Sequence, residues 1–233
     1  MVNKDNNLSY LKSLVRQRDM DRYLTILLCS SASQPALFSL AALNVELANI
    51  PEMVKEPGLS AIRYQWWRDA FEDRKAISGN PVVDSVNVAA QEYNLPTAHM
   101  IQLIDRYEEF EYTPSDGDDA KLLAVDAPLY ELMALVLGGQ PSGILTRAAE
   151  AAALSMAAAK FTGHEGLGRA NARECAGQLE KLDPKIFDAV FDAFLPVSLI
   201  ELYLKGDAED PGRQLRRLWT LWRAHRKRRL FKE

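Results

Sequence analysis

Apolar residues recur at intervals of three and four along almost the whole chain, and this periodicity most limits the folds it can adopt. Such spacing lines up apolar side chains on one face of an α-helix, whereas the alternation that marks β-strands is scarce. Proline stands at or near the start of many periodic segments, where its missing N–H is harmless. The sequence therefore predicts an all-α fold, a bundle of about nine or ten helices.

The composition is that of an ordinary folded protein and excludes several functional classes. Of 233 residues, 48% are hydrophobic and 26% are charged, which excludes a disordered chain. A net charge of −4 argues against a globally basic nucleic-acid binder. Cys29 and Cys175 form no Cys-x-x-Cys pair, so neither a zinc ribbon nor a dithiol site is expected. Since no signal peptide or run of about 20 apolar residues is present, we expect a cytoplasmic protein.

The chain is expected to consist of one helical domain, a linker and a terminal helix. No change in composition is strong enough to divide residues 1–204 into two domains. Residues 205–212 are typical of a linker, and residues 213–233 are predicted to form a separate helix. Within the domain, residues 148–159 hold eight alanines in twelve positions. Such a smooth helix suits the centre of a bundle, because its neighbours can approach closely.

One stretch, residues 62–73, places two adjacent tryptophans between two arginines and ahead of several acidic residues. Its sequence is Ile-Arg-Tyr-Gln-Trp-Trp-Arg-Asp-Ala-Phe-Glu-Asp. By composition alone, an amphipathic helix held by tryptophan packing and by ion pairs four residues apart accounts for it.

This stretch nevertheless resembles the Ile-Arg-Leu-Gln-Trp-Trp-Arg-Asp-Ala signature of the squalene/phytoene synthase family. Residues 18–24 and 35–40 are similar to that family's first two helices, and residues 104–106 to its following helix. The resemblance implies an isoprenoid-synthase-like bundle and, in active members, head-to-head condensation of two prenyl diphosphates. It also implies a substrate-binding role for Arg63, Gln65, Trp66, Trp67, Arg68 and Tyr23.

Active members of that family hold Mg²⁺ between two Asp-rich helices, where the ions neutralise the leaving diphosphate. At the first of these positions, this chain has Ala48 and Asn49 in place of aspartates, with Glu52 at the last. At the second, residues 154–168 offer alanines and Lys160 but no matching pattern. The departure from the family pattern predicts a pseudoenzyme that needs no cofactor.

Asp188 and Asp192 have the spacing of an Asp-rich motif but lack the Gln, Asn and Arg-Asp that precede it in the family. A solvated acidic face accounts for them better.

The sequence leaves three functions open. Residues 44–48, Asn-Val-Glu-Leu-Ala, are similar to the family's non-catalytic branch of mitochondrial complex I assembly factors, which suggests assembly of a respiratory complex with its subunits as partners. A second possibility is a prenyltransferase whose rearranged Mg²⁺ ligands are Glu46, Glu52, Asp69 and Asp73. The third is an isoprenoid-binding carrier whose apolar pocket is lined by Trp66, Trp67, Tyr23 and Phe38.

The last residues form a basic amphipathic segment, with Leu215, Leu218, Trp219 and Trp222 at helical spacing. Residues 213–233 carry a net charge of +8 and the rest of the chain −12, so this helix could simply pack on the acidic body. An anionic bilayer would attract it by about 1 kcal/mol per basic residue. We expect peripheral binding to an anionic inner-membrane surface, and not to nucleic acid, through Arg216, Arg217, Trp219, Trp222, Arg226, Arg228 and Arg229.

Overall fold

The computed structural model describes residues 4–54, 56–73, 78–112, 124–162, 165–205 and 212–231. Within these ranges the chain is helical and contains no β-strand, which confirms the predicted all-α bundle. The elements in chain order are α1 (Lys4–Arg18), α2 (Met20–Leu28), α3 (Gln34–Met53), α4 (Pro57–Glu72), α5 (Pro81–Glu92), α6 (Thr97–Tyr112), α7 (Ala127–Val136), α8 (Gly143–Ala157), the π-helix η2 (Ala158–Thr162), α9 (Glu165–Leu179), α10 (Pro184–Val190), the 3₁₀-helix η3 (Phe191–Leu199), α11 (Ile200–Leu204) and α12 (Arg213–Lys227).

Local sequence signals set where these helices begin. Proline occupies the first turn of α3, α4, α5 and α10, as the sequence predicts. Side-chain caps start other helices: the Ser142 hydroxyl accepts from the backbone N–H of Leu145 at the start of α8, at 3.2 Å. Gly138, with φ of +99°, ends the turn after α7, where other residues would be strained.

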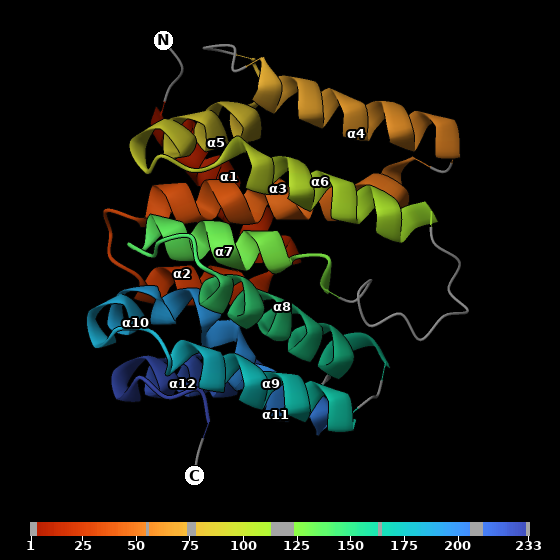
Figure 1. The fold of residues 1–233 in the computed structure, drawn as a ribbon. Coiled ribbons are helices and arrows are strands. Elements are labelled where there is room, and N and C mark those ends of the chain that lie inside the picture. Colours follow the sequence, from red (N-terminus) through yellow and green to blue (C-terminus); the bar gives the residue numbers. More distant parts are fainter. Residues whose placement is uncertain are drawn as a thin grey trace.

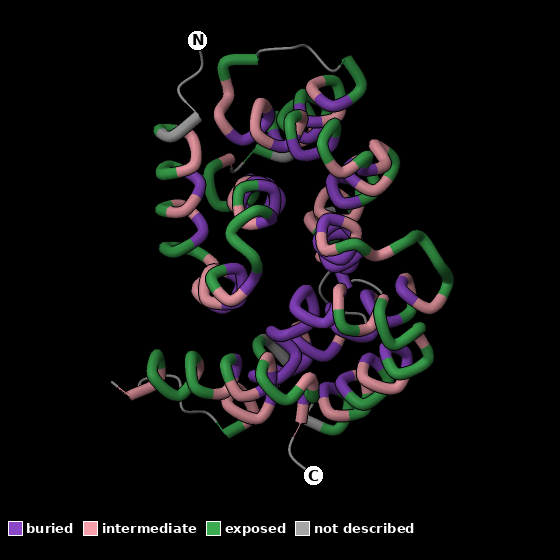
Figure 2. Tube along the Cα trace, turned by 90° about the vertical axis from the view of Figure 1, so that its left-hand side faces the viewer, coloured by how far each residue is buried: buried purple, intermediate pink, exposed green. Residues whose placement is uncertain are grey.

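The helices are stacked along the long axis of the molecule, with α4 at one end and α9, α11 and α12 at the other (Figure 1). Between these ends lie α1 and α3, then α2 and α7, then α8. Buried residues lie on the sides of the helices that face the interior (Figure 2). The largest fully buried side chains are aromatic, among them Tyr64, Tyr130, Phe38, Phe71, Phe191 and Phe194.

The alanine-rich helix α8 lies in the interior and packs against α7 and α9. Ala148, Ala149, Ala152 and Ala153 are all buried, in agreement with the expected position of this segment. Their small side chains allow the close approach that a central helix requires.

Helix α12 packs on the bundle rather than standing apart from it. Leu221 is fully buried, and Ala224 and Leu230 belong to the same hydrophobic core as the rest of the chain. The helix contacts η3 and α2. Of the predicted linker, residues 206–211 lie outside the described ranges. Among the described helices, none combines the length and apolar character needed to cross a bilayer.

Candidate functional site

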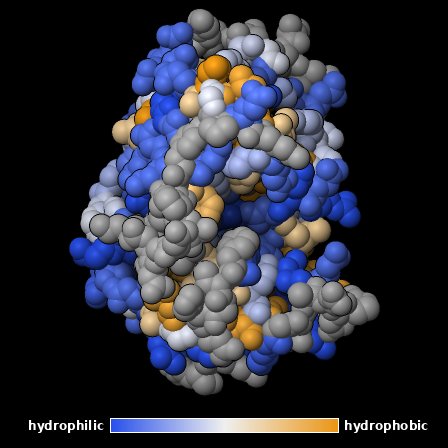
Figure 3. All heavy atoms as spheres, turned by 90° about the vertical axis from the view of Figure 1, so that its right-hand side faces the viewer, coloured by the Kyte–Doolittle hydropathy of each residue, from blue (hydrophilic) through white to orange (hydrophobic). Residues whose placement is uncertain are grey.

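A cavity of about 500 Å³ lies between the ends of α1, α3, α6 and α8. Its wall is largely apolar, with Val45, Ala48, Phe110, Met156 and Ala157. The C-terminal ends of α3, α6 and α8 lie on one side of the stack of helices, at the right in Figure 1. The surface on that side is hollowed, and hydrophilic atoms lie inside the hollow (Figure 3). We call this space the central cavity.

A break between α1 and α2 places a charged group in the floor of the central cavity. Asp19 caps α2, and its carboxylate accepts the backbone N–H of Arg22 at 3.1 Å. The Arg22 guanidinium donates to that carboxylate at 2.6 Å and also to Asp126, which precedes α7. It lies over the ring of Tyr130 at 5.1 Å. One buried arginine thus neutralises two carboxylates that come from separate parts of the chain.

The pKa shifts in this group favour the charged forms. Burial raises the pKa of Asp19, but Arg22 and Lys160 outweigh that effect and the net pKa is lowered. Burial lowers the pKa of Arg22, but Asp126 and Asp19 raise it well above its ordinary value. Asp19 and Arg22 therefore remain ionised at neutral pH.

Lys160 projects into the same cavity from η2, the π-helical turn that extends α8. Its amine is 3.1 Å from Asp21, whose side chain is only 4% exposed. Asp21 also accepts a hydrogen bond from the Tyr203 hydroxyl and lies 3.4 Å from Arg217 of α12. Burial is the main cause that raises the pKa of Tyr203 to about 12. This cluster connects the central cavity to the C-terminal helix.

Polar groups also mark the other side and the mouth of the cavity. The Tyr107 hydroxyl donates to Asn44 at 3.0 Å, and burial raises its pKa. At the mouth, Arg18 and Glu52 form an exposed ion pair at 3.2 Å. Among the residues that the structure describes, the carboxylates that line the cavity are Asp19, Asp126 and Glu52, and each has an arginine partner.

The structure places the tryptophan-rich helix α4 away from this cavity. Trp67 points into the core and stacks on Phe71 at 6.0 Å, while Arg68 pairs with Asp105 at 2.7 Å and with Glu108 on α6. Arg63, Gln65 and Trp66 lie on the exposed side of the helix. None of these predicted substrate-binding residues lines the central cavity.

Tyr23 and Phe38 pack on each other at 5.8 Å, and Phe38 is fully buried. They do not line the central cavity either. The carrier pocket was predicted to be lined by Trp66, Trp67, Tyr23 and Phe38. The structure does contain an open cavity, but these four residues do not line it.

The predicted alternative metal ligands are not brought together. Glu52 lines the cavity, whereas Glu46 accepts a hydrogen bond from Tyr10 at 3.5 Å on α1. Asp69 accepts from Gln65 at 2.7 Å on α4, and Asp73 follows the end of that helix. Over the described part of the chain, no three His, Cys, Asp or Glu side chains converge in a way that could hold a metal ion.

Of the charged residues that line the cavity, sequence reasoning proposed a site role only for Glu52. Arg22 and Asp126 are 104 positions apart, so no local spacing reveals their ion pair. The only signal for Asp19 is the dense run of charges in residues 18–22, which the resemblance assigned to a helix start. Lys160 was noted only as a departure from the second Asp-rich motif.

The seven residues predicted to bind a membrane divide into two groups. Five are exposed: Arg216, Trp219, Trp222, Arg226 and Arg229. The other two turn toward the protein. Arg217 contacts Asp21 and Tyr203, and Arg228 pairs with Asp188 at 2.8 Å and with Asp192.

Asp188 and Asp192 do not both belong to a solvated acidic face. The side chain of Asp188 is 66% exposed, as expected, but that of Asp192 is 10% exposed and also pairs with His225 at 2.9 Å. The expectation is wrong for Asp192 because α12 folds back over η3 and covers it.

Comparison with known proteins places these features in a family. The chain is similar to the protein of Bos taurus named NADH dehydrogenase (ubiquinone) complex I, assembly factor 6, with 34% identity over 104 residues. The protein of Homo sapiens with that name is 31% identical over 102 residues. In both cases the match covers 43% of this chain and 31% of the relative, so it spans less than a third of the relatives' length.

The family model for squalene/phytoene synthase matches residues 15–162, which are more than half of the chain and include all the described residues that line the central cavity. The resemblance inferred from the tryptophan-rich stretch is thereby confirmed, and the chain belongs to the squalene/phytoene synthase family.

Proposed function

We propose that this chain is a non-catalytic member of its family that acts in the assembly of a respiratory membrane complex, with subunits of that complex as partners. The observation that carries the proposal is the charge arrangement of the central cavity. Arg22 and Lys160 line it, and the carboxylates that line it in the described part of the chain are paired with arginines. The similarity to proteins named as complex I assembly factors supports the assembly role.

The residues present do not fit the Mg²⁺ ions that the family implies. Mg²⁺ requires several oxygen ligands in near-octahedral geometry at about 2.0–2.1 Å. Here Ala48 and Asn49 supply no carboxylate from α3, and Lys160 adds a positive charge to the lining. Binding of metal by Asp19 or Asp126 would compete with Arg22, which already holds both.

An assay with farnesyl diphosphate and Mg²⁺, run beside an active synthase of the family, tests the absence of catalysis. We expect no release of diphosphate and no condensed product. Formation of a condensed product would contradict the proposal and would favour an enzyme with rearranged ligands.

Deletion of the gene in the organism that encodes the chain tests the assembly role. We expect the membrane NADH dehydrogenase to fall in amount on native gels and to recover when the wild-type chain is restored. A normal amount of assembled complex in the deletion strain would contradict this role.

A second candidate is isoprenoid binding without chemistry, and the observation in its favour is the volume and apolar wall of the central cavity. Ligand-binding pockets commonly measure about 300–1,000 Å³, and this cavity lies within that range at about 500 Å³. Lipid extraction and mass spectrometry of the purified protein would detect a bound prenyl compound.

Substitution of Ala48 separates the two candidates. Ala48→Trp should fill the cavity without altering the core, because Ala48 is exposed on the cavity wall. If binding is the function, this variant should lose both the lipid and the ability to restore the deletion strain. Val88→Trp, at an exposed position on α5, is the matched control.

We also propose peripheral association of α12 with an anionic membrane, at the cytoplasmic side of the inner membrane. Its support is the exposure of large apolar side chains beside basic ones: Leu215 is 74% exposed and Trp219 is 62% exposed. We expect salt-sensitive sedimentation with anionic vesicles but not with phosphatidylcholine vesicles.

Leu215→Ser with Trp219→Ser should weaken this sedimentation and leave the protein folded, because Leu221 still anchors the helix. Equal sedimentation with both kinds of vesicle would contradict membrane association by this route.

A further inference from the structure

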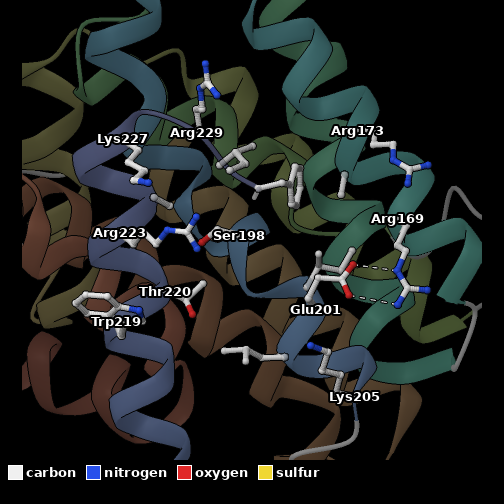
Figure 4. A pocket seen from close by; sticks show the side chains of 16 residues that line it. Arg169, Arg173, Ser198, Glu201, Lys205, Trp219, Thr220, Arg223, Lys227 and Arg229 are labelled. Atoms are coloured by element: carbon white, nitrogen blue, oxygen red, sulfur yellow. Dashed lines mark hydrogen bonds and ion pairs between the residues drawn. The ribbon is translucent and has the colours of Figure 1, made fainter. Parts of the chain in front are cut away.

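A second cavity, of about 490 Å³, lies at the opposite end of the bundle from α4. It is bounded by α9, α11, α12 and the residues that follow α12 (Figure 4). Arg169 and Arg173 lie along one side, and Trp219, Arg223 and Lys227 project from α12 on the other. We call this space the basic pocket.

Six cationic side chains line the basic pocket: Arg169, Arg173, Lys205, Arg223, Lys227 and Arg229. Among the described residues, the only carboxylate in its lining is Glu201. Glu201 accepts two hydrogen bonds from Arg169, at 2.9 and 3.3 Å, so it neutralises that arginine. These hydrogen bonds, against the effect of burial, lower the pKa of Glu201 and keep it ionised.

Arg223 and Lys227 have no acidic partner within the described ranges. Arg173 and Lys205 form no ion pair there, although both act on Glu201 at longer range and help to lower its pKa. Like charges held around one concave surface repel one another and raise the local concentration of anions. Apolar side chains, including Ile200, Leu230 and Phe231, form the rest of the wall and limit the access of water to a bound group. This combination favours a multiply charged anion, and arginine in particular binds phosphate through paired hydrogen bonds.

The exposed apolar face of α12 adjoins the basic pocket. Trp219 lines the pocket and also stacks on Trp222 at 5.1 Å, on the face that carries Leu215 and Leu218. A ligand that places a phosphate in the pocket would therefore place any attached acyl chains along exposed apolar side chains. A free phosphate would leave that apolar face uncovered.

We propose that the basic pocket binds the phosphate headgroup of an anionic phospholipid, while the apolar face of α12 contacts the acyl chains. The proposal rests on the membrane association proposed above and adds a defined headgroup site to it. The membrane association alone requires only that basic residues lie near the surface, in any arrangement.

Two variants of equal charge test the headgroup site by sedimentation with vesicles of phosphatidylcholine containing about 20% phosphatidate. The first is Arg223→Gln with Lys227→Gln, in the pocket. The second is Arg216→Gln with Arg226→Gln, on the same helix outside the pocket. Loss of two surface charges alone should weaken binding about 30-fold in both.

If the pocket binds the headgroup, the first variant should weaken vesicle binding at least about tenfold more than the second. Equal losses would overturn the headgroup site and leave membrane association standing. Circular dichroism and thermal unfolding of both variants show whether either has lost its fold.

A second measurement does not depend on a membrane. Dihexanoyl phosphatidate, below the concentration at which it forms micelles, should change the fluorescence of the wild-type protein in a saturable way, because Trp219 lines the pocket. The pocket variant should lose this response, the matched variant should keep it, and dihexanoyl phosphatidylcholine should cause none.

The remaining outcomes separate the two proposals. Inorganic phosphate that binds as tightly as the short-chain phosphatidate would overturn the assignment to a lipid. Saturable binding of the short-chain lipid without sedimentation on vesicles would support the pocket and overturn the membrane association.

Discussion

The central cavity and the basic pocket have nearly equal volumes, about 500 and 490 Å³, but opposite arrangements of charge. In the central cavity, Arg22 pairs with two aspartates and Lys160 pairs with a third. In the basic pocket, the one carboxylate in the described lining, Glu201, forms an ion pair with Arg169, whereas Arg173, Lys205, Arg223 and Lys227 form no ion pair in the described structure. Charges of the first kind hold helices together, whereas charges of the second kind are available to an external anion.

Substitution of Arg22 should give the largest effect. Arg22→Met removes the ion-pair partner of both Asp19 and Asp126 in a largely buried site, which typically costs about 3–5 kcal/mol in the free energy of unfolding. Urea denaturation followed by circular dichroism measures the loss. Arg18→Met is the control, because its pair with Glu52 is exposed and should contribute about 0–1 kcal/mol. A loss for Arg22→Met as small as that for Arg18→Met would show that the buried charges of the cavity do not stabilise the fold.

A comparison of two lysines, one from each cavity, should give the next largest difference. Lys160→Met removes one partner of the buried Asp21, which keeps Arg217 and Tyr203, so we expect a loss of about 1–3 kcal/mol. Lys205→Met, in the basic pocket, should change the free energy of unfolding by no more than about 0.5 kcal/mol. Equal effects would contradict the distinction between the two cavities.

The dependence of stability on pH should distinguish Arg22→Met from the wild type by its direction. The folded pKa of Asp19 is lowered, so its contribution is complete above the unfolded value of 3.8 and is lost as the pH falls through the folded pKa. In Arg22→Met, only Lys160 still opposes the effect of burial, so the pKa of Asp19 rises and protonation costs the folded state less.

The difference in free energy of unfolding between wild type and Arg22→Met should therefore be smaller at about pH 3 than at about pH 7. A constant difference over this range would show that the substitution acts by lost packing and not by unpaired charge. Asp19→Asn in the Arg22→Met background is the control, since it should remove most of the pH dependence.

Periodicity and proline positions were sufficient to predict the all-α fold, because helices are formed by local interactions. The tryptophan-rich stretch was sufficient to identify the family. The position of that stretch was not predictable, since periodicity does not say whether a tryptophan faces a cavity or the core. Trp67 and Phe71 fill the core between α4 and its neighbours, and the cavity lies elsewhere.

The charged residues of the cavity depend on contacts between distant parts of the chain. The pairs of Arg22 with Asp126 and of Asp21 with Arg217 exist only after α2, α7 and α12 have packed. The same packing divides the basic residues of α12. Their spacing predicted an amphipathic helix, but only the structure distinguishes Arg217, which contacts the buried Asp21, from Arg223, which lines the basic pocket.

The smallest expected effect is on the stability of the basic-pocket variant, Arg223→Gln with Lys227→Gln. Neither side chain has an acidic partner in the described structure, so no favourable contact is lost, and removal of two positive charges relieves repulsion. At low salt we expect the free energy of unfolding to stay equal or to rise by up to about 0.5 kcal/mol.

Added NaCl should stabilise the wild type more than the variant, because salt screens a repulsion that only the wild type retains in full. Arg169→Gln serves as the contrast: it breaks the pair with Glu201, so it should be neutral or weakly destabilising at low salt. A clear loss of stability in the double variant would mean that these cations hold the fold, as Arg22 does, and would remove the difference between the two cavities.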